Sequence, residues 1–210
     1  MSTAEPPAEP KKKRDLTAVV LIVCGLVGVV LGIMRMQRGI KEFVGSVGDP
    51  EMKRLLAESD QAIDDANKLM LDAAPLFQQL MNEIDRWGLD GVRQQKQELA
   101  QQVSERFGKA AGMLRTAAQE VDDAAERNVA DKLKPFLAEK SQAYRLTADA
   151  CARNQEIVAL VLDKSIATLA DLMPKIEAVA MKRDAAQKAA ADASAKADEA
   201  ARQFQSPAKS

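Results

Sequence analysis

The sequence contains no histidine, and this absence excludes most of the common catalytic and metal-binding arrangements. Without histidine there is no Ser-His-Asp or Cys-His nucleophile system, and no Glu-x-x-His pair for a carboxylate-bridged di-iron centre. The two cysteines, Cys24 and Cys151, are too few for a Cys/His zinc site and predict no disulfide framework. We therefore expect no enzyme activity, no cofactor, no metal and no small-molecule substrate.

Aromatic residues are also scarce, at 3% of a chain that is 47% hydrophobic. A core of Leu, Ile, Val, Met and Ala with few rings suits narrow seams between helices better than the wide core of a mixed fold. After Ala100 alanine is dense and glycine is sparse, which favours helix. The composition therefore predicts an all-α protein.

No basic patch follows Lys41. Residues 1–41 carry a net charge of +4, whereas the remaining residues carry a net charge of −5. Proteins that bind a phosphate backbone usually present clustered Lys and Arg side chains. We therefore expect no nucleic-acid partner.

The longest uncharged stretch of the chain is residues 16–34, LTAVVLIVCGLVGVVLGIM. A helix needs about 20 apolar residues to cross a bilayer core, so this stretch predicts a single transmembrane helix. It is longer than the apolar region of a signal peptide, and no small-x-small cleavage site follows it. We expect it to stay in the protein as an N-terminal anchor.

Basic residues on the N-terminal side of this stretch predict its orientation. Lys11, Lys12, Lys13 and Arg14 should keep residues 1–15, a disordered basic tail rich in proline, in the cytoplasm. The large domain would then lie outside, and the inner membrane of a bacterium is the expected location. Within the anchor, Gly28 and Gly32 are four residues apart and Gly25 lies one turn earlier, a pattern that lets two membrane helices pair closely.

A first long helix is predicted for residues 50–87, after a juxtamembrane linker at residues 35–49. Asp49 is suited to capping this helix, and Pro50 to its first position. A seam with alternating steps of four and three residues follows: Met52, Leu56, Ser59, Ile63, Ala66, Met70, Ala73, Phe77, Leu80, Ile84 and Trp87. This regularity is typical of coiled-coil packing. Pro75 should kink the helix, and Gly88 should end it.

Two further helices are predicted, at residues 91–127 and 131–205, before a tail at residues 206–210. The seam of the second runs from Leu99 to Ala124, and that of the third runs without a phase break from Leu137 to Phe204. Short turns make successive helices antiparallel. The prediction is an elongated antiparallel coiled-coil-like bundle of three helices, with a kink near Pro174. A fourth helix that starts near Pro174 is the alternative.

Few side chains in this bundle suggest chemistry. The carboxylate pairs Asp64–Asp65 and Asp122–Asp123 are adjacent in sequence, so the members of each diverge by about 100° around a helix and belong to solvated faces. Cys151, Tyr144 and Trp87 lie on the seams and are expected to pack. Arg183 interrupts a seam, which suggests a polar residue that sets the register, contacts a carboxylate of another helix, or marks the end of the bundle.

These features predict a membrane-anchored coiled-coil scaffold or tethering protein. It would act through helix–helix contacts with a protein partner or by self-association, without catalysis. The alternative is an extracytoplasmic helical-bundle sensor or ligand-binding domain that signals through a partner. Lipid binding by the bundle is disfavoured, because its polar faces lack the Lys/Arg enrichment of helices that lie on membranes.

Overall fold

The computed structural model describes residues 49–127, 131 and 133–205, which form four helices and no strand. They are α2 (Pro50–Gln95), α3 (Gln97–Ala125), α4 (Lys134–Leu162) and α5 (Leu169–Gln205). The predicted tails at residues 1–15 and 206–210, the anchor at residues 16–34 and nearly all of the linker at residues 35–49 lie outside the described residues. None of the described helices combines the length and hydropathy needed to cross a membrane.

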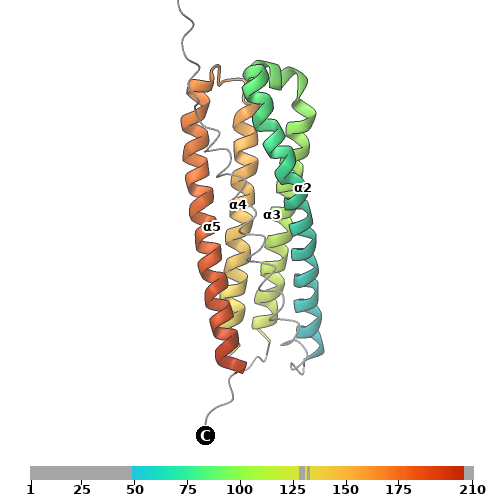
Figure 1. The fold of residues 1–210 in the computed structure, drawn as a ribbon. Helices are drawn as coiled ribbons and strands as arrows, with labels where there is room; N and C mark the ends of the chain where they lie inside the picture. The colour runs from blue at the N-terminus through green and yellow to red at the C-terminus, as the bar shows by residue number, and fades with distance from the viewer. Residues whose placement is uncertain (1–48, 128–130, 132, 206–210) are drawn as a thin grey trace, which may run out of the picture.

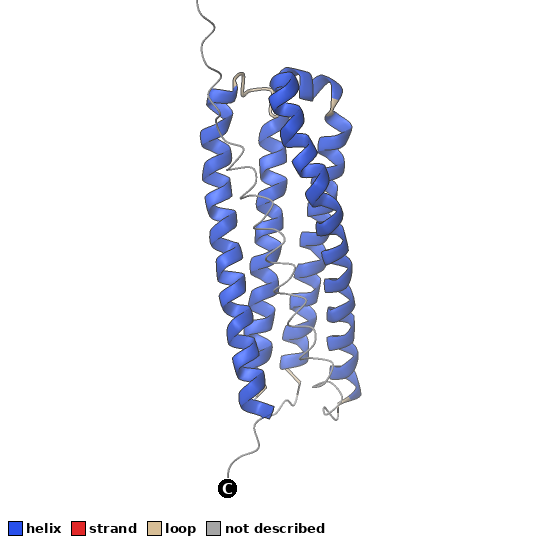
Figure 2. Ribbon diagram, viewed as in Figure 1, coloured by secondary structure: helices blue, strands red, loops and turns tan. Residues whose placement is uncertain are grey.

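The four helices run up and down side by side, with the loops at the two ends of the rod (Figures 1 and 2). Consecutive helices pack on one another along their lengths, and α2 also contacts α4. By contrast, α5 packs extensively on α4 alone, so α5 is an edge helix. The all-α prediction is therefore confirmed for the described residues. The three-helix arrangement is wrong, because a loop at residues 163–168 separates α4 from α5 before Pro174 is reached.

The start of α2 follows the prediction. Asp49 is extended, and its carboxylate accepts a hydrogen bond from the Glu51 backbone N–H at 2.9 Å, while Pro50 occupies the first turn. Pro75 lies within the helix. The end of α2 differs from the prediction, because helical structure resumes after Gly88 and continues to Gln95. This short segment crosses the end of the rod towards α3 (Figure 1).

Gly88 provides the turn between the two parts of α2, with φ 70° and ψ 177°. Only glycine adopts this backbone region readily, and another residue there is strained by about 1–3 kcal/mol. We therefore expect Gly88→Ala to lower the free energy of unfolding by that amount, although nothing lies within 4 Å of the added Cβ. Gly112→Ala is the matched control, because Gly112 is exposed within α3 and has equal space around it.

In chemical denaturation followed by circular dichroism, the control should gain about 0.5–1 kcal/mol from its better helix propensity. If the two alanine variants were equally stable, the backbone at Gly88 would not be strained.

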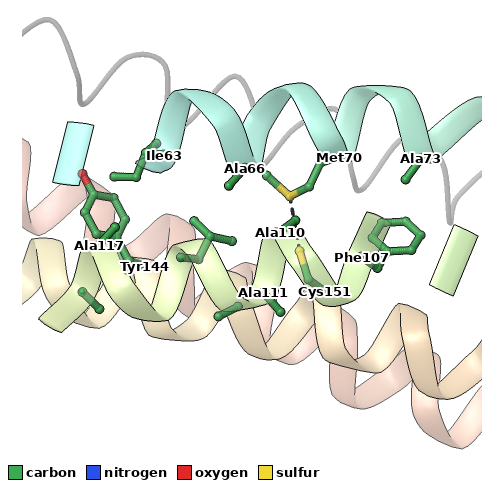
Figure 3. Packing of buried hydrophobic residues seen from close by; sticks show 14 of the residues in the cluster. Ile63, Ala66, Met70, Ala73, Phe107, Ala110, Ala111, Ala117, Tyr144 and Cys151 are labelled. Atoms are coloured by element: carbon green, nitrogen blue, oxygen red, sulfur yellow. Dashed lines mark hydrogen bonds between the residues drawn. The ribbon is translucent and has the colours of Figure 1, made fainter. Parts of the chain in front are cut away.

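The core contains most of the predicted seam residues of α2, α3 and α4 and extends to α5 through Leu172, Ile176 and Val179. Phe77 of α2 and Phe107 of α3 form an edge-to-face pair with ring centroids 5.9 Å apart. Figure 3 shows Met70 of α2 pointing towards Cys151 of α4, while Ile63 lies two turns away along α2, nearer to Tyr144. Trp87, Ser165 and Leu169 are exceptions among the predicted seam residues, because they are exposed; Trp87 is 45% exposed and carries the guanidinium of Arg86 over its ring.

Candidate functional site

The residues predicted to act in function fall into two groups. Gly25, Gly28 and Gly32, proposed for pairing of membrane helices, lie outside the described residues. Arg183 lies on α5, where its side chain is 1% exposed. Its Nη1 donates to the Asn154 side-chain oxygen of α4 at 3.4 Å, and its Nε and Nη2 donate to Asp184 at 2.9 and 2.6 Å. Its carboxylate partner therefore comes from the next residue of α5 and not from another helix.

A buried lysine on α4 was missed at the sequence level. The Lys140 side chain has no exposed surface, and its ammonium lies 3.2 Å from the Asp60 carboxylate of α2. The ammonium also lies 5.4 Å from the centre of the Tyr144 ring. Burial lowers the pKa of Lys140 to about 8, and the charge and hydrogen bond of Asp60 partly oppose that decrease. The pair therefore links α2 to α4 with a cation that is costly to keep in the core.

Three other buried polar side chains lack partners among the described residues. They are Asn67 of α2, through both amide atoms, Tyr144 through its hydroxyl, and Asn154 of α4 through its amide nitrogen. Burial is also the main reason why the pKa of Tyr144 lies well above its ordinary value, with smaller contributions from Asp60 and Asp64. Each buried atom without a hydrogen bond costs about 1–3 kcal/mol. Lys140 and Tyr144 lie near Asp60 of α2, whereas Asn154 faces Arg183 of α5, so buried polar groups occur on both of these sides of α4.

The cysteine of α4 is unreactive by position. The thiol of Cys151 is buried and lies 3.3 Å from the thioether sulfur of Met70 (Figure 3). Burial raises its pKa to about 12. The thiolate, which is the nucleophilic form, is therefore nearly absent at neutral pH.

The two carboxylate pairs do not converge on any site. Asp65 accepts hydrogen bonds from Gln61 and Lys68 along α2. Asp122 pairs with Arg145 of α4, whereas Asp123 accepts a hydrogen bond from Gln119. No group of three or more acidic or cysteine side chains in the described helices is arranged to hold a metal ion.

An arginine at the end of the rod joins two segments that are distant in sequence. The Arg93 side chain is 7% exposed and donates to the backbone carbonyls of Val161, Asp163 and Ile166, at distances of 2.7–2.9 Å. These carbonyls belong to the end of α4 and the loop that follows, where backbone acceptors lack the regular partners of a helix. Arg93 therefore fixes the turn between α4 and α5 to the end of α2.

Comparisons with known proteins leave this arrangement without a relative: no family model, no curated protein and no solved structure matches the chain. The described residues form an all-α helical bundle in which Lys140, Tyr144 and Cys151 are buried between helices.

Proposed function

We propose that the protein is a membrane-anchored helical scaffold or tether that acts through helix–helix contacts with a protein partner or a second copy, and that it performs no catalysis. The observation that carries the proposal is the position of the side chains that could take part in catalysis. Lys140, Tyr144 and Cys151 are buried between helices, where a substrate would not reach them. Exposed charges instead form local pairs along single helices, such as Arg54 with Glu51 and Glu58.

The apolar run at residues 16–34 supports the anchor part of the proposal. It precedes α2 by a short linker, so the rod would begin near the membrane and extend away from it. The basic residues before the run favour a cytoplasmic N-terminus and a rod on the opposite side of a bacterial inner membrane.

A fractionation experiment on the full chain tests the anchor. Expressed in bacterial cells, the chain should remain in the membrane pellet after alkaline carbonate extraction. Val27→Arg combined with Val30→Arg should move most of it to the supernatant, because each arginine costs about 2.5–3.5 kcal/mol at the centre of a membrane helix. Leu71→Arg is the control, since Leu71 is 45% exposed on α2 and its replacement should leave the protein in the pellet. Extraction of the unaltered chain by carbonate would refute the anchor.

One observation favours the alternative function of a sensor. The unpartnered polar atoms of Asn67, Tyr144 and Asn154 would be satisfied by small polar ligands that entered the core between the helices. Thermal-shift screening of the full chain in detergent against polar metabolites tests this alternative. A stabilising ligand whose effect is lost in Asn67→Leu and Asn154→Leu would replace the scaffold proposal with the sensor.

A further inference from the structure

The loop between α4 and α5 lacks the strongest helix breakers, although its Asp163, Ser165 and Thr168 favour turns and helix caps. Residues 163–168 read Asp-Lys-Ser-Ile-Ala-Thr, with no glycine or proline. The seam of α4 also continues in phase into α5, with steps of four and three residues through Leu162, Ser165, Leu169 and Leu172. A loop that must turn the chain back usually contains a residue that breaks the helix, as Gly88 does between the two parts of α2. The sequence is therefore compatible with one uninterrupted helix from α4 to α5.

The contact between α4 and α5 has a spacing that suits such a helix. Asn154 and Arg183 meet across this interface and are 29 residues apart. This separation is close to eight turns of a helix with 3.6 residues per turn. In an uninterrupted helix the two side chains would therefore point in the same direction, and so would the α4 and α5 surfaces that pack together in the hairpin. Two such helices placed antiparallel would bring Asn154 of each against Arg183 of the other.

We propose that the α4–α5 hairpin opens into one continuous helix, and that two copies in this form exchange α5 so that each α5 packs on α4 of the other copy. The partner is a second copy because its α5 already carries the complementary surface. Every α4–α5 contact of the hairpin recurs in the exchanged dimer, so the two forms differ mainly in the loop. The dimer has two-fold symmetry, with an axis near the loop residues.

Contacts at the loop hold the hairpin closed. Arg93 donates to the carbonyls of Val161, Asp163 and Ile166, and a continuous helix would redirect all three of these carbonyls into its own backbone ladder. Thr168 caps α5 by accepting a hydrogen bond from the Asp171 backbone N–H at 3.2 Å. Loss of the Arg93 contacts should therefore favour the exchanged dimer.

The exchanged dimer has a geometric consequence for the anchor. Because α2 and α4 run in the same direction, both begin at the end of the rod where the chain leaves residue 48. Antiparallel pairing of two continuous helices places Asp49 of the two copies at opposite ends of the dimer. The exchange would therefore connect copies in two facing membranes and not neighbours in one membrane. This consequence rests on the proposed anchor, whereas the exchange itself does not.

Cross-linking between two differently tagged full-length chains tests the exchange. Both chains carry Cys24→Ala and Cys151→Ala; one also carries Asn154→Cys and the other Arg183→Cys. They are co-expressed, purified in mild detergent and incubated for many hours with a short bis-maleimide, so that transient opening of the α4–α5 interface exposes the buried thiols to the reagent. We expect a cross-linked heterodimer, and Arg93→Ala in both chains should increase its yield about fivefold or more. Lys182→Cys replaces Arg183→Cys in the matched control, because Lys182 is exposed on α5 and should give little product.

Two further variants make each outcome decisive. A single chain with both Asn154→Cys and Arg183→Cys should cross-link within itself, which verifies that the altered α5 still packs on α4. Glycines inserted between Ser165 and Ile166 should reduce the heterodimer, because they disfavour a continuous helix. A heterodimer yield no higher than the Lys182 control, with Arg93→Ala present, would overturn the exchange. The fractionation of the same chains shows separately whether the anchor holds.

Discussion

Replacing Lys140 with methionine should stabilise the protein by about 3 kcal/mol at pH 7. The pKa of this lysine falls from 10.5 to about 8 in the folded chain because its ammonium is buried, and each pKa unit corresponds to about 1.4 kcal/mol. Methionine keeps a similar length and apolar stem without the charge. Asp60, which is 15% exposed, retains access to water after the change. Chemical denaturation of the full chain in detergent measures the difference.

The pH dependence of this effect has a defined sign. Below pH 8 the lysine is protonated in both states, so the folded state bears the whole penalty. Between pH 8 and 10.5 the folded chain loses the proton while the unfolded chain keeps it. The unfolded state then binds more protons, so stability rises with pH. The advantage of Lys140→Met should therefore shrink across this range and vanish above it. An advantage that stayed constant to pH 11 would contradict the assignment.

Asp60→Asn provides the complementary measurement. It removes the charge that keeps Lys140 protonated, so the lysine should become neutral at pH 7 in the folded state. The extra cost is then limited to about 1–2 kcal/mol, because losing the proton is cheaper than burying an unpaired charge. In the Lys140→Met background the same substitution should cost almost nothing. A double-mutant cycle of the two changes therefore isolates the ion pair.

Phe107→Ala should be the most destabilising of the substitutions considered, with a loss of about 3–5 kcal/mol. Phe107 has no exposed surface, and its ring meets the edge of Phe77 across the α2–α3 seam. The neighbouring side chains are mostly aliphatic and smaller than a ring, so they cannot fill the cavity left by Phe107 unless the helices move. The midpoint of urea unfolding, followed by circular dichroism, should decrease accordingly.

Met181→Ala serves as the comparison for this loss. Met181 is 73% exposed on α5, so its truncation should change the stability by less than about 0.5 kcal/mol. Phe107→Leu should lie between the two, because leucine retains much of the buried area. Equal effects of Phe107→Ala and Met181→Ala would mean that α2 and α3 do not pack through this ring pair.

The seams of the first two helices could be predicted from sequence because their large apolar side chains mark one stripe on each helix; the second buried stripe of α3 contains only small residues such as Ala111 and Ala118. Ile63, Phe77, Val103 and Leu114 recur at the spacing that places them on one face, and the structure buries all four completely. Such a stripe specifies which residues face the core regardless of the tertiary arrangement. The burial predicted for Trp87, the last residue of the first seam, was wrong because the chain turns at Gly88.

The α4 helix was harder to predict because it packs on both sides. Besides the seam that includes Leu137 and Val158, it buries a second stripe that includes Lys140, Thr147 and Asn154. Polar residues on a helix normally indicate a solvated face, so periodicity alone assigns this stripe to the surface. The loop at residues 163–168 was missed for a related reason. The phase of the seam does not change there and the segment has no glycine or proline, whereas tertiary contacts such as those of Arg93 help to determine the turn.

The alternation of up and down helices places both ends of the described chain, Asp49 and Gln205, at the same end of the rod (Figure 1). A force applied between these ends would pull α5 away from α4 one turn at a time, starting at its C-terminal end. Contacts broken in sequence resist far less than contacts that must slide past one another together. The helices therefore separate one after another when tension acts between Asp49 and Gln205. Tension between this end of the rod and the opposite end would act along the axes of all the helices.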